Sequence, residues 1–178
     1  ITFAKVEGLD EEPSWGYMCG REPGEKKKMN HEFRLFRTRE KLLMNTGKTD
    51  VAKDAPKVAI PRSLSLHSYM PMWRRFFGEL GYKTVVTPVT NSEIKVMGTE
   101  IAGGDFCFPV KVALGHARYA FEKMDADYVF MPYTVSNRPN QYTSNALFCP
   151  YVQSYPSLVR TALELHGIDP SKIIAPVM

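Results

Sequence analysis

The sequence is poor in cysteine, and its three cysteines form no CxxC pair. A disulfide framework needs an even set of regularly spaced cysteines in a secreted chain, so we expect reduced thiols and a cytoplasmic location. No apolar run approaches the ~20 residues that span a bilayer, and no transmembrane helix is predicted. The phosphate-binding run GxxxxGK(S/T) is also missing, and Gly103 and Gly104 form only a lone glycine pair. ATP hydrolysis is therefore not expected from these residues.

What is present is a chain of 178 residues with 44% hydrophobic content, enough for one domain with a real core. It opens at Ile1 and stops directly after an expected strand, so we expect it to be a piece of a longer protein. Residues 1–54 differ in composition from the rest, because they mix charges of both signs and contain few β-branched residues. They are interpreted as an N-terminal arm or linker with one helix, capped by Asn30 and running through Leu43, whose apolar side would dock on the main domain.

The arm is basic, with nine Lys or Arg against four Glu between Arg21 and Lys48. A charge run is usually a solvated face, and no recognised nucleic-acid motif accompanies this one. We therefore expect no nucleic-acid partner and no membrane partner.

From Lys57 onward, β-branched runs alternate with helical patterns. This order predicts an α/β domain over 55–178, with an open, mainly parallel sheet and helices on both faces, as in Rossmann-like or flavodoxin-like folds. Thr90 and Glu93 have the spacing of a capping box for a short helix ending near Gly98. The other expected elements are strands at 57–60, 84–87, 127–131 and 173–175, and helices at 68–80, from Pro109 onward, and at 156–166.

The run DFCFPVKVALGH, residues 105–116, places Cys107 just before a helix that should start at Pro109, because proline suits the first helical turn. The unpaired N–H groups and the dipole at such a terminus favour a thiolate, which predicts a metal ligand or a reactive sulfur. The expected buried face of this helix consists of Val110, Ala113, Leu114, Ala117, Ala120 and Phe121.

Cys149 repeats the arrangement, because it directly precedes Pro150 near another helix start. In open α/β sheets ligands bind beyond the carboxyl ends of the strands, so both cysteines and the loops 61–67 and 132–148 are expected at one edge. The long polar loop 132–148 is expected to cover the site. The competing interpretation is that both thiols are buried and inert, as free cysteines often are.

Other side chains are candidates for binding a substrate or partner. Arg62 and His67 belong to the loop after the first strand of the domain and are well placed for this. Lys111, one turn after Cys107, suits a negative charge on a cluster or a phosphate, although an exposed helix lysine is the common alternative. His116 lies more than two turns beyond Cys107 and is interpreted as a structural histidine.

Four segments carry a resemblance to a known family. They read VAIPRSLSLHSYMPMWRRFFGELGYKTVVTPVTN, DFCFPVKVALGH, DYVFMP and CPYVQSYPSLVR, in this order. Together they resemble the uncharacterised domain of acyl-CoA dehydratase activase-related proteins, which accompanies activators of 2-hydroxyacyl-CoA dehydratases such as 2-hydroxyglutaryl-CoA dehydratase. More distantly they are similar to the dehydratase subunits. The resemblance covers Lys57–Met178, and RLFRTREKLL before it also resembles the family.

The resemblance implies an iron–sulfur module in anaerobic metabolism, which takes part in low-potential electron transfer to a dehydratase. Cluster iron is held by cysteine thiolates, and the resemblance makes Cys107 and Cys149 the ligands of a cluster, expected to be of the 4Fe–4S type. Two ligands leave the set incomplete in this chain, with Cys19 or a residue beyond Met178 as the third. The implied partners are an activator ATPase module, dehydratase subunits and an acyl-CoA, and a cluster at a subunit interface implies self-association of the isolated domain.

Two alternatives remain open. One is a non-catalytic docking or CoA-binding domain of a larger activase polypeptide, with no bound metal and structural cysteines. The other is a zinc site formed by Cys107, Cys149 and a histidine, either His67 or His116, although these spacings match no structural zinc motif.

Overall fold

A computed structural model describes residues 2–10, 14–15, 34–138, 141 and 145–178. The chain forms two compact units, residues 1–36 and 37–178. In the first unit, strand β1 (Thr2–Phe3) pairs antiparallel with β2 (Ser14–Trp15). Cys19 and Asn30, to which the sequence assigned a third cluster ligand and a helix cap, lie outside the described residues. The boundary of the arm at residue 54 stays a prediction.

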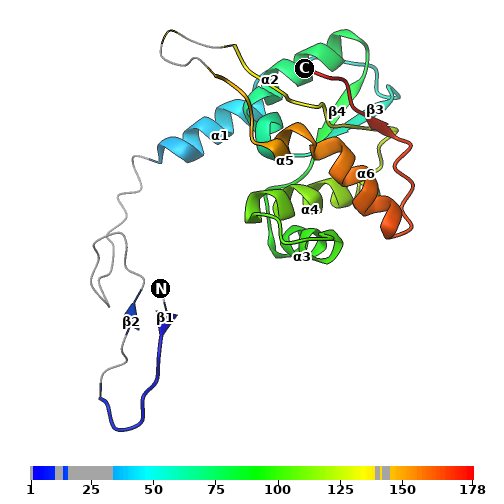
Figure 1. Cartoon of the computed structure of the whole chain (residues 1–178). Coiled ribbons are helices and arrows are strands. Elements are labelled where there is room, and N and C mark those ends of the chain that lie inside the picture. The colour runs from blue at the N-terminus through cyan, green and yellow to red at the C-terminus, as the bar shows by residue number, and fades with distance from the viewer. Residues whose placement is uncertain (1, 11–13, 16–33, 139–140, 142–144) are drawn as a thin grey trace. The chain divides into compact units, whose positions relative to one another are not determined.

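The second unit is built on a four-stranded sheet, with the strand order β4-β3-β5-β6. Every neighbouring pair is parallel, as the alternation of strands and helices predicted. The expected open α/β fold is thereby confirmed, and Figure 1 shows its elements in chain order. The strands are β3 (Lys57–Ile60), β4 (Lys83–Val86), β5 (Tyr128–Phe130) and β6 (Ile173–Ile174).

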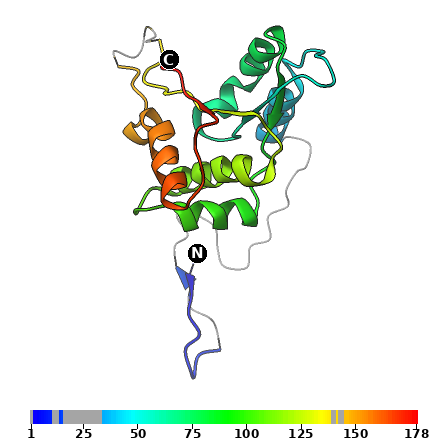
Figure 2. The same ribbon diagram turned by 90° about the vertical axis from the view of Figure 1, so that its right-hand side faces the viewer.

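Helices cover both faces of this sheet because successive strand residues point to opposite sides. Ala59 and Val129 pack in the core cluster of helices α4 (Phe108–Lys123) and α6 (Tyr155–Leu165). Their chain neighbours Val58, Ile60 and Phe130 pack instead with helix α2 (Leu64–Glu79). Figures 1 and 2 show α2 on one side of the strands and α4 with α6 on the other.

Helix α4 buries the face that its sequence pattern predicted. Five of the six expected positions are buried and Phe121 is partly buried against the same cluster. Helix α3 (Ser92–Ile101) packs closely on α4, and Gly98 and Gly115 are the contact positions. Added Cβ atoms would clash with the carbonyl groups of Lys111 and Ile94, respectively. The two backbones can approach this closely only because neither glycine has a side chain.

Two expectations about α3 are wrong. Its N-cap is Asn91, whose side chain accepts a hydrogen bond of 2.9 Å from the Ile94 N–H, so the capping box of Thr90 and Glu93 does not form. The helix also continues through Gly98 to Ile101, because Gly98 serves the contact with α4 and does not end the helix.

The remaining helices are α1 (Leu35–Asn45) and α5 (Pro150–Gln153). Helix α1 buries no residue fully, and its Phe36 is 90% exposed. Within the second unit it contacts α2 through Met44, which packs against the α2 core cluster, and through a hydrogen bond of 3.1 Å from Arg39 to Ser68. Among the described residues, no helix has the length and apolar character needed to cross a membrane.

Candidate functional site

The carboxyl edge of the sheet contains a switch point between β3 and β5. Strand β3 leads through α2 to one side of the sheet, and β5 leads through α5 and α6 to the other side. The loops after these two strands touch, because the hydroxyl groups of Ser65 and Thr134 are 3.1 Å apart and Asn137 donates to the Tyr69 hydroxyl at 3.1 Å. The expectation that loops 61–67 and 132–148 share one edge is confirmed. Ligands of open α/β sheets bind at such a point.

Cys107 and Cys149 have the same position relative to their helices. Each is an N-cap residue. One proline follows it within the first two helical positions, as expected from the sequence. Neither cysteine side chain forms a capping hydrogen bond, and both are exposed and free. This exposure contradicts the alternative of buried, inert thiols. Both sulfur atoms are available to a ligand.

An aromatic contact joins the two cysteine segments. Phe106, next to Cys107, meets Tyr151 edge to face, with ring centroids 5.3 Å apart and an interplanar angle of 83°. Tyr151 is two residues after Cys149, so the contact brings the two N-caps into one neighbourhood. The Tyr155 hydroxyl adds a second connection, because it donates to the Ala113 carbonyl of α4 at 2.8 Å from a buried position. Burial raises the pKa of this phenol, which therefore stays protonated at neutral pH.

The described residues contain no group of three or more His, Cys, Asp or Glu side chains that could hold a metal ion. The two thiols fit a part of a cluster's ligand set, since cluster iron is normally held by three or four protein ligands. Lys111 lies in the first turn of α4 as expected, and its ammonium group is paired with the exposed Asp105 at 3.1 Å. A negative ligand near Cys107 would find this lysine one helical turn away.

Arg62 and His67 lie together at the start of α2, but Arg62 is already paired. Its guanidinium group forms an ion pair of 2.5 Å with Glu40 of α1, and its side chain is only 13% exposed. His67 is half-buried, and burial lowers its pKa, with further lowering by Arg62 and Arg39. His67 is therefore neutral at physiological pH and keeps a lone pair for a proton or a hydrogen bond.

His116 is fully buried and uses both ring nitrogens. Nδ1 lies 2.7 Å from the Thr87 hydroxyl, and Nε2 lies 2.9 Å from the Thr90 hydroxyl. The Thr87 oxygen also accepts the Arg62 backbone N–H at 2.8 Å. Both ring nitrogens have a hydrogen-bond partner when the Thr87 hydroxyl donates to Nδ1 and the Nε2–H group donates to the Thr90 hydroxyl. The structural interpretation of His116 is supported, since no ring nitrogen remains for a zinc ion.

The loop between β3 and α2 has two features that sequence reasoning missed. Leu64 has a positive φ of 49°, which is strained for a residue with a side chain. Ser63, the N-cap of α2, is 5% exposed, and its hydroxyl forms no capping hydrogen bond. No local sequence pattern indicates either feature.

These observations define an α/β domain with two exposed cysteines at helix N-cap positions. A family model described as the CoA enzyme activase uncharacterised domain matches residues 57–178, and the chain belongs to this family. The family and the matched residues are the same as those of the resemblance seen in the sequence. No curated protein and no solved structure matches the chain.

Proposed function

We propose that this domain is an iron–sulfur module of a 2-hydroxyacyl-CoA dehydratase and activase system, with Cys107 and Cys149 as cluster ligands. Membership of the CoA enzyme activase family supports the activase-related role. The observation that carries the proposal is the pair of exposed thiols on two equivalent N-caps, joined by the contact of Phe106 with Tyr151. Such a cluster supplies one-electron transfer when bound.

The chain's own residues would hold and tune the group. The N-terminus of the sixteen-residue α4 favours negative charge beside Cys107, and Lys111 adds a positive charge one turn further. Helix α5 has only four residues, so its dipole adds little at Cys149. The remaining ligands would come from Cys19, from residues after Met178 or from a partner such as the activator or a dehydratase subunit. The reducing cytoplasm proposed for the protein suits such a cluster.

The test is the iron and acid-labile sulfide content of protein reconstituted under strict anaerobiosis, together with its visible absorption. We expect several irons per chain and a broad absorption, and we expect Cys107→Ser and Cys149→Ser each to abolish both. Because serine is nearly isosteric and both sites are exposed, the fold should survive, which circular dichroism checks. Cys19→Ser is the matched thiol control: loss of iron would assign it as a third ligand, and retention would exclude it.

A second candidate is a docking or CoA-binding domain without metal. A mainly apolar cleft of about 270 Å³ between α3, α4 and α6 favours it, with Phe106, Leu114 and Leu158 among its lining residues. An absence of iron from the native protein would contradict the cluster proposal and favour this candidate. Full retention of iron in both cysteine variants would instead contradict the assignment of Cys107 and Cys149 as ligands.

A further inference from the structure

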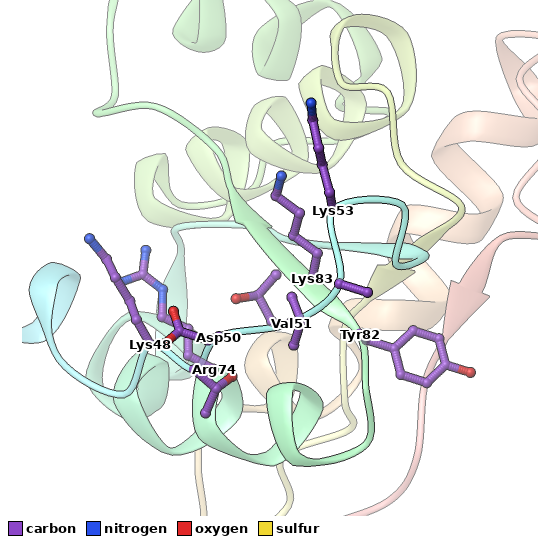
Figure 3. Close-up of a pocket in the computed structure, with 10 residues that line it drawn as sticks. Lys48, Asp50, Val51, Lys53, Arg74, Tyr82 and Lys83 are labelled. Carbon is purple, nitrogen blue, oxygen red and sulfur yellow. The ribbon is translucent and has the colours of Figure 1, made fainter.

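A basic pocket lies away from the cysteines, where β4 begins and not where the strands end. Its volume is about 280 Å³, and it is lined by residues 48–53, by Arg74 of α2 and by residues 82–84. Four of its lining side chains are cationic and one is anionic, which leaves a net charge of +3 (four minus one). The charged residues are Lys48, Lys53, Arg74, Lys83 and Asp50. Figure 3 shows these five side chains, with Lys53 and Lys83 extending in the same direction.

The wall formed by residues 48–53, together with Gly47 before it, packs closely against α2. Gly47 has a φ of +74°, and a Cβ atom there would clash with the Pro71 carbonyl. Gly78 of α2 in turn leaves room for the Thr49 side chain, which would clash with any Cβ at that position. Both contacts need a glycine, so the segment that carries Lys48 and Lys53 is seated in a defined place before any ligand arrives. A preformed wall of this kind lowers the entropic cost of binding.

The cations of the pocket lack carboxylate partners. Within the described ranges, none of the four takes part in a salt bridge, whereas Lys57 nearby is paired with Asp125 and Arg62 with Glu40. Arg74 is half-buried and donates a hydrogen bond to the Met44 carbonyl. Burial, and to a smaller extent Arg62, lowers the pKa of Arg74, which remains positive at neutral pH. The single carboxylate of the pocket, Asp50, does not balance four cations, so these like charges repel one another and an anion would reduce the repulsion.

We propose that this pocket binds the phosphate groups of a phosphorylated small molecule. The planar donor fork of arginine and the point charges of three lysines are the groups that recognise phosphate oxygens. They come from three elements and surround the opening, which suits several adjacent negative charges better than one carboxylate. The volume accommodates a diphosphate-sized group and is too small for a helix of a partner protein. The pocket lining includes neither Cys107 nor Cys149, so the proposed phosphate site does not depend on the proposed cluster.

The test is calorimetric titration of the whole protein with pyrophosphate at about 0.1 M ionic strength, where the Debye length is about 10 Å. We expect saturable binding that Lys53→Ala combined with Lys83→Ala weakens by about tenfold, the effect of losing two exposed ionic contacts. The matched control removes two exposed lysines outside the pocket, Lys41→Ala with Lys95→Ala, and changes affinity by less than about twofold because distant charges are screened. Asp50→Asn removes the one negative charge of the pocket and is expected to tighten binding, a gain that misfolding does not produce.

Three outcomes would overturn the proposal. The first is an absence of pyrophosphate binding by the native protein. The second is equal weakening by the pocket and control variants, which would show attraction to overall charge only. The third is binding of a poly-glutamate peptide, weakened by the pocket variant, with no binding of pyrophosphate, which would identify an acidic protein segment as the occupant.

Discussion

Replacing Gly115 with alanine is expected to destabilise the domain by about 2–3 kcal/mol. The added Cβ atom would clash with the backbone carbonyl of Ile94 on α3. Backbone atoms cannot rotate aside as a flexible side chain does, so α3 and α4 would have to separate and loosen the packing of Ile94 and Met97, which are buried. The measurement is urea unfolding followed by circular dichroism.

The sign of this result is decisive, because helix propensity alone would make alanine the better residue by about 1 kcal/mol. The control is Gly103→Ala, since a Cβ atom at Gly103 would meet nothing within 4 Å. It should leave the free energy of unfolding within about 0.5 kcal/mol of the native value. A Gly115→Ala protein as stable as the native one would show that the two helices do not need this close approach.

The stability of the domain is expected to fall by about 3 kcal/mol between pH 6.5 and pH 4 because of His116. The pKa of His116 is lowered to about 4 from its ordinary value of 6.5, mainly by burial and to a smaller extent by the Arg62 charge and by His67. Between these two pH values the unfolded chain binds a proton at this position and the folded chain does not. Acidification therefore favours unfolding, and the contribution of neutral His116 is complete only above pH 6.5.

The check is a comparison with His116→Gln, which cannot titrate, in urea unfolding at several pH values. At pH 7.5 the variant should be less stable than the native protein by about 1–3 kcal/mol, because the bonds to Thr87 and Thr90 are disturbed. This difference should shrink as the pH falls to 4. His67, whose pKa burial also lowers, is present in both proteins and largely cancels from the comparison. A difference that stays constant with pH would mean that His116 does not titrate in this range.

Much of the fold was predictable because the local signals agree with one another. The strand 57–60 was expected with the bounds that β3 has, and the expected buried face of α4 is buried. Gly81 and Gly167 end the helices before them, with φ values of +82° and +72°. In each case the residue type alone carries the physical cause, either apolar spacing or the freedom of glycine to adopt a positive φ.

Errors occurred at the start of α2 and at both ends of α3, and the two in α3 arise where a distant contact overrides a local signal. Helix α2 begins at Leu64, four residues before the expected Ser68, although Leu64 itself has an unfavourable positive φ of 49°. The cap of α3 is Asn91 because the Thr90 hydroxyl is engaged with His116. Gly98 resembles a helix end in sequence and is instead the point where α4 approaches. No window of sequence around these residues contains their partners.

The sequence by itself determined the order of the elements, the parallel sheet and the placement of Cys107 and Cys149 at helix starts, because proline, glycine and apolar spacing act locally. Only the tertiary structure decided that Phe106 meets Tyr151, that Arg62 is paired with Glu40, and that residues 48–53 meet Arg74 and Lys83 in one pocket. These contacts join residues far apart in the chain. They depend on how helices pack across the sheet, which no local pattern encodes.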